Sequence, residues 1–246
     1  MSIALLITAV ALQAAAAVGA LWRGAWARGL LAGGVVAQGA ALASRGLAIG
    51  AFPVTSKLES FAALGLALAL VALASWRGER HYTVPFVLLA ACTSAAALLF
   101  PQAVRYPPPL MQTIWYPLHV PLAFGAYALW AAAAAAALAW WRDRDGAWLA
   151  RLDRFALQGF GLWSLSMICG GIWGVVAWGA YFLWDPKVIW SVLLWLHYAS
   201  FLHLRLTPSL AGRAWVRPAL AGLGLVWVAV AYVGTAFFFG GSSHAF

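Results

Sequence analysis

Residues 117–141 read PLHVPLAFGAYALWAAAAAAALAWW, an apolar run of 25 residues without a formally charged side chain. A hydrocarbon core of ~30 Å needs about 20 apolar residues as a helix, so this run predicts a membrane-spanning helix. Its alanine stretch, residues 131–137, is typical of sites where neighbouring membrane helices approach closely. Arg142 follows the run directly and marks its exit into water.

The rest of the chain has the same character. Of 246 residues, 65% are hydrophobic and 9% are charged, against about 45–50% and ~25% in ordinary soluble domains, which excludes a soluble globular protein. The net charge of +9 comes from cations scattered through apolar sequence without a nucleic-acid-binding motif, so no nucleic acid partner is expected. Cys92 and Cys169 lie inside apolar runs without ligand spacing, and we expect both to be buried core residues.

Charges and prolines divide the chain into eight apolar runs, so we predict an all-α polytopic membrane bundle of about eight transmembrane helices. The predicted spans are 2–22, 29–50, 60–76, 84–103, 117–141, 155–177, 187–204 and 217–239. No internal repeat or flexible linker interrupts them, so residues 1–246 are expected to form a single domain. Residues 1–20 lack the basic start of a secretory signal and are kept as the first span.

The cations orient these spans. With the amino terminus outside, eleven cations fall in inner connections and three in outer ones, as the positive-inside rule requires. Both termini are then outside. The outer three are Lys57, Arg105 and Lys187, and Arg45 lies within the second span.

Aromatic residues concentrate in one predicted outer connection. Within eighteen residues the chain carries Trp173, Trp178, Tyr181, Phe182, Trp184 and Trp190. This density favours a surface for a large flat apolar ligand, and an aromatic belt at the membrane interface is the alternative. Inside the cluster, Asp185 followed by Pro186 is typical of a helix start, with Asp185 as N-cap and Pro186 at the first helical position.

Histidines at membrane depth point to a function. His119 and His244 both fall on the side of the aromatic connection, and two imidazoles beside an aromatic surface are what axial ligation of haem iron requires. Interfacial polar residues are the alternative. His203, 17 residues after Pro186, lies about 25 Å deeper and belongs to a different site. We expect His197 to be a hydrogen-bonded packing residue and His81 to be a solvated surface residue.

Residues 173–190, WGVVAWGAYFLWDPKVIW, resemble the tryptophan-rich WWD segment of haem-handling proteins of cytochrome c biogenesis, most closely the CcsA/ResC type of system II. Four other pieces agree in order. They are Phe52-Pro53 to Leu58-Glu59-Ser60, Leu118-His119-Val120, Trp195 to Ala199 with Leu202 to Arg205, and Gly240 to His244. The likeness covers most of residues 52–246.

The resemblance implies that the protein moves haem b across the membrane and presents it to apocytochrome c for thioether attachment at a C-x-x-C-H motif. It implies a holocytochrome c synthase subunit in which residues 170–195 form the outward-facing WWD segment. By position, His119 and His244 would ligate the outer haem iron, and His203 would belong to an inner haem site. A separate CcsB/ResB-type partner would complete that inner site.

The resemblance also marks haem-contacting residues and departures from the family pattern. Family members commonly carry Arg, Trp and Glu where this chain has Ala180, Phe182 and Val188. They also carry polar residues where this chain has Val175 and Val176. Lys187 and Arg105 remain as outer cations for the haem propionates, with interfacial anchoring as the alternative. The implied haem-contacting set is Trp173, Trp178, Tyr181, Trp184, Asp185, Lys187 and Trp190, besides the three histidines.

Three functions stay open from the sequence. The first is haem transport and synthase activity in the bacterial cytoplasmic membrane, with the haem-presenting face toward the periplasm or cell exterior. The second is a haem-binding delivery component of an ABC-type maturation route without synthase activity. The third is a structural subunit or small-solute carrier without haem. Eight spans and the Trp-Asp-Pro-Lys run favour the first.

Overall fold

The chain folds as a bundle of helices. The computed structural model describes residues 2–22 and 24–237, and every regular element within them is a helix. Eight long helical segments match the eight predicted spans, with the last continuing through a π-helical stretch. They are α1 (Ser2–Leu21), α2 (Trp26–Ile49), α3 (Lys57–Ala74), α4 (Arg80–Ala97), α5 (Trp115–Asp143), α6 (Ala147–Trp178), α7 (Pro186–His203) and α9 (Val216–Ala229).

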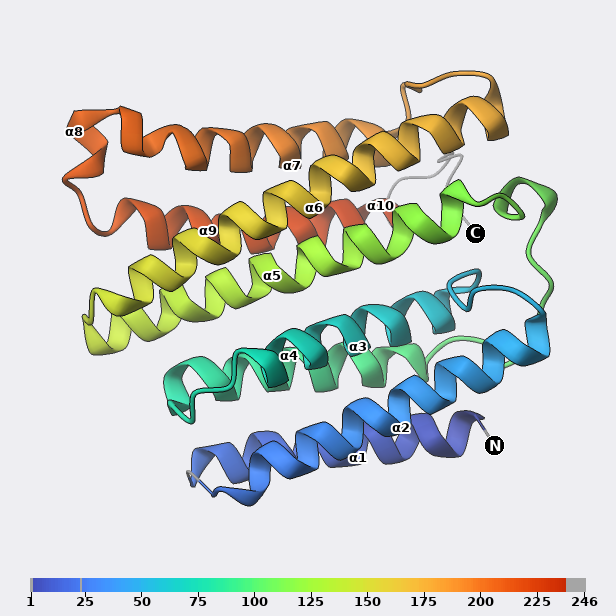
Figure 1. Ribbon diagram of the computed structural model, residues 1–246, viewed down its shortest axis with the longest axis horizontal. Coiled ribbons are helices and arrows are strands. Elements are labelled where there is room, and N and C mark those ends of the chain that lie inside the picture. Colours follow the sequence, from blue (N-terminus) through green and yellow to red (C-terminus); the bar gives the residue numbers. More distant parts are fainter. Residues whose placement is uncertain (1, 23, 238–246) are drawn as a thin grey trace.

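Six of these segments are long and apolar enough to cross a membrane. The other two, α4 and α7, are 18 residues long but carry charged or polar residues at their starts. Both lie lengthwise in the same bundle, α4 against α3 and α1, and α7 against α6 and α9 (Figure 1). The membrane bundle predicted from the sequence is therefore confirmed as a fold.

Two predicted boundaries were wrong. Helix α4 ends at Ala97 rather than near residue 103, and residues 101–108 are not helical. Pro101 disfavours helical geometry in residue 100 and lacks the main-chain N–H that a helix needs, so α4 does not continue past it. Helix α6 begins at Ala147 rather than near residue 155. Of the charges that precede the predicted span, Asp153 is accommodated inside α6, where it pairs with Arg217 at 2.7 Å.

Helix α5 forms the centre of the bundle. In the apolar 18-residue stretch by which α5 could cross the membrane, 78% of the residues are buried, against 22% in the corresponding stretch of its neighbour α6. The alanines at 131–137 are all buried, as expected for close helix packing. Beside them, the Trp130 and Tyr198 rings stack with centroids 3.8 Å apart, so aromatic side chains fill the space that the alanines leave.

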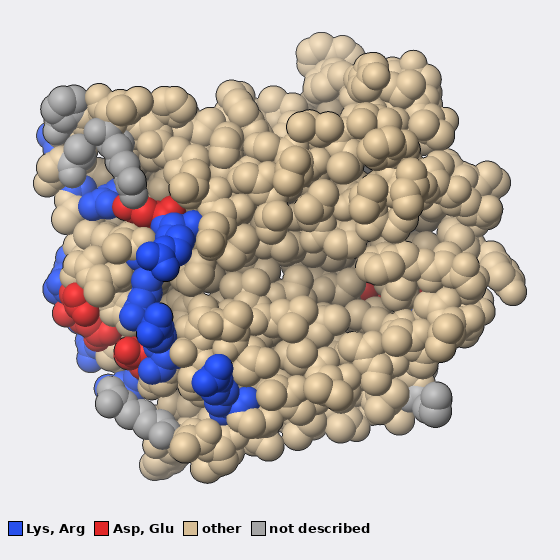
Figure 2. Space-filling model, in the orientation of Figure 1, with Lys and Arg blue, Asp and Glu red and all other residues tan. Residues whose placement is uncertain are grey.

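The two ends of the bundle differ in charge. Figure 2 shows the Lys and Arg side chains of the visible face gathered at its left-hand end, where Figure 1 places the connection between α5 and α6 and the short helix α8 (Pro208–Ala211). Helix α1 starts, and α10 (Thr235–Phe237) ends, at the opposite end (Figure 1). This asymmetry supports the predicted orientation, in which the left-hand end faces the cytoplasm.

The cysteines correct an expectation about the core. Cys169 is half-buried, and Cys92 is exposed on the outside of α4; both are free thiols. Placing Cys92 in the core was wrong, because the lipid-facing surface of a membrane protein is also apolar and an apolar run does not indicate which face is buried.

Candidate functional site

A cavity of about 210 Å³ opens at the end of the bundle opposite the cation-rich end. Its walls come from the starts of α5 and α7, the last turns of α6, and the π-helical segment η3 (Val230–Gly234). We call it the His119 cavity. Among its lining residues are His119, Tyr127, Trp173, Tyr181, Lys187 and Tyr232.

The His119 imidazole is held from one side only. Its Nδ1 lies 2.8 Å from the carbonyl oxygen of Ser166. A carbonyl can only accept, so Nδ1 carries the proton and Nε2 keeps its lone pair. Within the described part of the chain Nε2 makes no hydrogen bond. This is the tautomer of a metal-ligating histidine whose other ring nitrogen donates to a backbone carbonyl.

Three residues on one face of α6 pack against the His119 imidazole and hold it in place. Ser166, Gly170 and Trp173 follow helical spacing, so they face α5 together. The Ser166 hydroxyl donates to the His119 carbonyl oxygen at 3.0 Å, and the Trp173 ring lies 20° from parallel to the imidazole. At Gly170 an added Cβ would lie 2.7 Å from Nδ1. The absence of a side chain at Gly170 therefore makes room for a candidate ligand.

The predicted helix start in the aromatic segment is confirmed. The Asp185 carboxylate accepts a hydrogen bond from the Lys187 backbone N–H at 2.8 Å, and Pro186 occupies the first helical position. Gly179, with φ of 75°, ends α6 in the left-handed conformation that glycine favours. The two helices are therefore joined by the short non-helical loop 179–185, which lies within the tryptophan-rich residues 173–190.

The tryptophans of residues 173–190 do not form one continuous surface. Trp173 is 2% exposed and donates through Nε1 to the Leu110 carbonyl oxygen at 2.7 Å, while Trp184 is 87% exposed. Trp178 packs edge-on against Trp173, and Trp190 packs against Trp227. Of the four predicted tryptophans only Trp173 lines the His119 cavity, and it does so as a buried wall.

The predicted cations separate in space. Lys187 lines the His119 cavity, whereas Arg105 is exposed in the connection between α4 and α5 and does not line it. Lys57, one turn before the cavity-lining Ser60, lies over the Phe237 ring at 4.8 Å. Lys187 is thus the cation of the described chain that lines the cavity.

Three tyrosines that line the His119 cavity were missed by the sequence reasoning: Tyr116, Tyr127 and Tyr232. Tyr127 and Tyr232 line the deeper part of the His119 cavity, with ring centroids 6.1 Å apart. Tyr232 belongs to the π-helical segment, a local irregularity often found at functional sites. Nothing in the apolar pattern signals a π-helical segment, but tyrosines inside membrane spans are a signal that could have been followed.

The remaining histidines occupy separate places. His203 is exposed at the end of α7, with Nδ1 2.7 Å from the Ala199 carbonyl oxygen. His197 bonds the Leu220 carbonyl oxygen at 3.0 Å, which confirms it as a hydrogen-bonded packing residue. His81 is partly exposed, with 31% of its side-chain surface accessible, and pairs with Asp143 at 2.8 Å. His244 lies outside the described residues.

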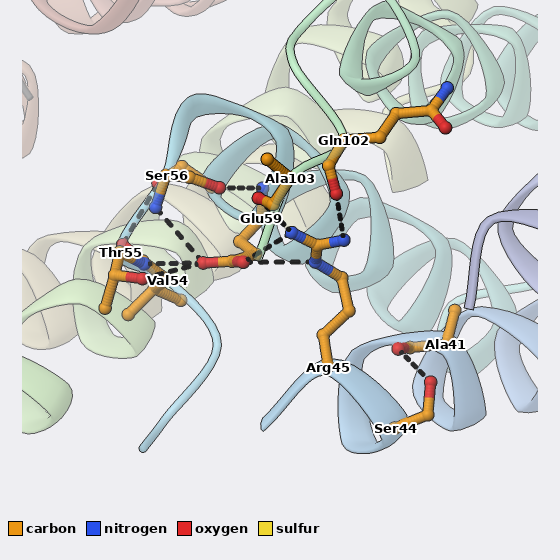
Figure 3. A network of polar contacts seen from close by, with 10 residues as sticks. Ala41, Ser44, Arg45, Val54, Thr55, Ser56, Glu59, Gln102 and Ala103 are labelled. Carbon is orange, nitrogen blue, oxygen red and sulfur yellow. Dashed lines mark hydrogen bonds and ion pairs between the residues drawn. The ribbon is translucent and has the colours of Figure 1, made fainter. Parts of the chain in front are cut away.

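A buried ion pair secures the loops beside the cavity (Figure 3). Arg45 on α2 and Glu59 on α3 meet at 3.0 Å with side chains 4% and 1% exposed. The Arg45 guanidinium also donates to the carbonyl oxygens of Gln102 and Ala103. The second Glu59 carboxylate oxygen accepts from Thr55 and from the Ser56 N–H. With every partner supplied, this pair holds the α2–α3 and α4–α5 connections together.

Comparison with known proteins identifies the family. Residues 54–239 match the family model described as Cytochrome C assembly protein. The chain belongs to this family. It is 30% identical over 243 residues to Cytochrome c biogenesis protein CcsA of Synechococcus sp. (strain CC9605), covering 79% of this chain and 78% of that protein. A protein of the same name from Guillardia theta is 45% identical over 80 residues, 32% of this chain and 26% of that one.

Family membership places the chain in cytochrome c assembly and confirms the resemblance drawn from residues 173–190. Its fold is also similar to a solved structure, Cytochrome c Heme Lyase CcmF, with a TM-score of 0.76 and 17% identity over 94% of this chain. The chain spans 46% of that larger protein. At this identity the match supports the membrane helical fold.

Proposed function

We propose that this chain binds haem b in the His119 cavity and presents it to apocytochrome c for thioether attachment, as a subunit of a holocytochrome c synthase. The observation that carries the proposal is the His119 imidazole, whose Nδ1 is bonded to the Ser166 carbonyl while Nε2 is left for a ligand in an aromatic cavity. Imidazole is a common axial ligand of haem iron.

The residues that line the His119 cavity fit haem, but the cavity must widen before haem can enter. His119 supplies a ligand nitrogen, and Lys187 supplies a cation for a propionate carboxylate. The cavity of about 210 Å³ is smaller than the ~300–1,000 Å³ usual for small-molecule sites. Tyr181 and Phe182 in its wall are 73% and 46% exposed, so they can be displaced at little cost. We therefore expect the loop 179–185 to move outward when haem enters.

The chemistry needs no nucleophile from this chain. Haem supplies the vinyl groups, and the incoming polypeptide supplies the cysteine thiols that add across them. His119 would fix the iron, Lys187 would fix a propionate, and the aromatic wall would exclude water. Together these contacts orient the vinyl edge toward the thiols. Trp178, Trp184, Asp185 and Trp190 complete the proposed haem-presenting segment, and His244 is proposed as the second ligand.

Haem supply is proposed to pass through a second site at His203. Its ring is exposed at the opposite end of α7, about 25 Å of helix from Pro186, too far to share an iron with His119. Exposure on the outside of the bundle leaves room for a ligand from a CcsB/ResB-type partner chain. The proposed location is the bacterial cytoplasmic membrane, with the His119 cavity facing the periplasm or cell exterior.

The test is the absorption spectrum of the purified protein, co-expressed with its partner. His119→Ala should remove the haem of the His119 cavity and leave only the share held at the proposed His203 site, and His197→Ala, the matched control from a packing histidine, should leave the haem content unchanged. The same cells are then scored for covalent cytochrome c. Equal haem content in both variants would remove the basis of the proposal, and haem binding without thioether formation would reduce the function to delivery.

A further inference from the structure

A second cavity, of about 480 Å³, lies among the connections near the buried ion pair. We call it the loop cavity. It is formed by the end of α2, the α2–α3 connection and the residues leading into α5. Its lining includes Ile49, Phe52, Tyr106, Met111 and Tyr116. The family comparison assigns it no role.

The surface of the loop cavity is mainly apolar, without a charged side chain in its lining. Most of its polar side chains are already engaged: the Thr55 hydroxyl donates to Glu59, the Gln112 amide donates to the Pro107 carbonyl oxygen at 2.8 Å, and the Thr113 hydroxyl oxygen accepts from the Tyr116 N–H at 3.4 Å. Such a lining suits an apolar side chain and offers nothing to a phosphate or a sugar.

The adjoining segment, residues 102–106, has free main-chain donors. None of its five backbone N–H groups donates a hydrogen bond within the described part of the chain, and every residue in it is exposed. Two carbonyl oxygens, those of Gln102 and Ala103, are held by Arg45 (Figure 3). The segment is therefore fixed along one side by a buried cation while its N–H groups remain available. Main-chain N–H groups are strong hydrogen-bond donors, so these five can pair with the main chain of an incoming polypeptide.

The loop cavity also borders the proposed haem site. Tyr116 lines both cavities, and its hydroxyl is fixed by a 2.9 Å hydrogen bond to the Val54 carbonyl oxygen. A chain bound in the loop cavity therefore lies one side chain away from the His119 cavity.

We propose that the loop cavity and residues 102–106 bind an extended segment of an unfolded polypeptide. The polypeptide pairs its main chain with the free N–H groups and inserts one apolar side chain beside Tyr106 and Met111. A lipid tail could fill the cavity but would leave those donors unused. The choice of a polypeptide rests on the proposed function, because thiols arriving at haem are carried by an unfolded chain.

The test measures peptide binding without haem, so it fails separately from the haem-binding test. The probe is a fluorescent 15-residue peptide with a Cys-x-x-Cys-His motif and a flanking phenylalanine, titrated onto the full chain in nanodiscs. Saturable binding is expected, and a peptide with serine in place of phenylalanine should bind at least fivefold more weakly. No saturable binding, or equal binding of the two peptides, would overturn the proposal.

Two substitutions locate the binding site. Ala51→Phe fills the loop cavity and should weaken peptide binding at least tenfold, whereas Leu99→Phe adds the same ring at an 83% exposed position outside it and should change binding less than twofold. Tyr106→Ala, at an 80% exposed position, is the second variant if Ala51→Phe fails to fold. Peptide affinity unchanged by filling the cavity or by removing Tyr106 would refute the site.

Discussion

Gly170→Ala should weaken haem binding although it changes no atom of the ligand. The added Cβ would lie 2.7 Å from His119 Nδ1 and 2.8 Å from Cε1. Ordinary contacts between such atoms are about 3.5–4.0 Å, so the ring must retreat by roughly 0.7–1.3 Å. That shift breaks its 2.8 Å hydrogen bond to the Ser166 carbonyl oxygen. Loss of such an outer contact typically costs about 10–100-fold in metal affinity, or about 1.4–2.8 kcal/mol.

The neighbouring glycine provides the control. At Gly171 an added Cβ would meet Tyr181 at 3.6 Å, an ordinary contact. Both substitutions favour the helix by about 1 kcal/mol, so neither should lose haem through unfolding. The assay is haem per protein after purification, with the Soret band recorded before and after adding imidazole. Gly170→Ala should lose haem and recover its ligand band with imidazole, and Gly171→Ala should match the parent. Equal haem retention in the two variants would refute the idea that contacts from α6 position the His119 imidazole for haem binding.

Three further outcomes follow from other parts of the bundle. Glu59→Gln leaves the buried Arg45 cation without its counter-charge and should destabilise the protein by about 3–5 kcal/mol, measured as a lower thermal midpoint; an unchanged midpoint would contradict the buried pair. Asp185→Ala removes an N-cap and should cost about 1 kcal/mol in the same assay, with wild-type stability counting against the cap. In a cysteine-free background, Leu99→Cys should be labelled by an impermeant thiol reagent from outside and Arg151→Cys only after permeabilisation; the reverse pattern would invert the orientation.

The architecture could be predicted because each of its causes is local. Apolar length gave the helices, and the Asp185-Pro186 pair gave the start of α7. His119 could be singled out because an imidazole is costly at membrane depth.

The walls of the site could not be predicted, because they depend on which helix faces meet. The sequence does not distinguish buried Trp173 from exposed Trp184, since lipid and protein interior are both apolar. It also does not signal the π-helical turn that carries Tyr232, or the contact that makes Gly170 more than a packing residue. These depend on helix rotation, which the hydrophobic pattern of a membrane helix barely encodes.

The Arg45 and Glu59 pair has a consequence for how the chain enters the bilayer. Only the short connection 50–56 separates α2 from α3, and near that connection α2 carries Arg45 while α3 carries Glu59 and the cation Lys57. The charge of Arg45 or of Glu59 alone would raise the free energy of insertion by about 2.5–3.5 kcal/mol at the centre of the membrane. A hairpin in which Arg45 and Glu59 are already paired leaves Lys57 as the charge near the connection that this pair does not compensate. We therefore expect α2 and α3 to be inserted together, and a chain truncated between them to stall in translocation.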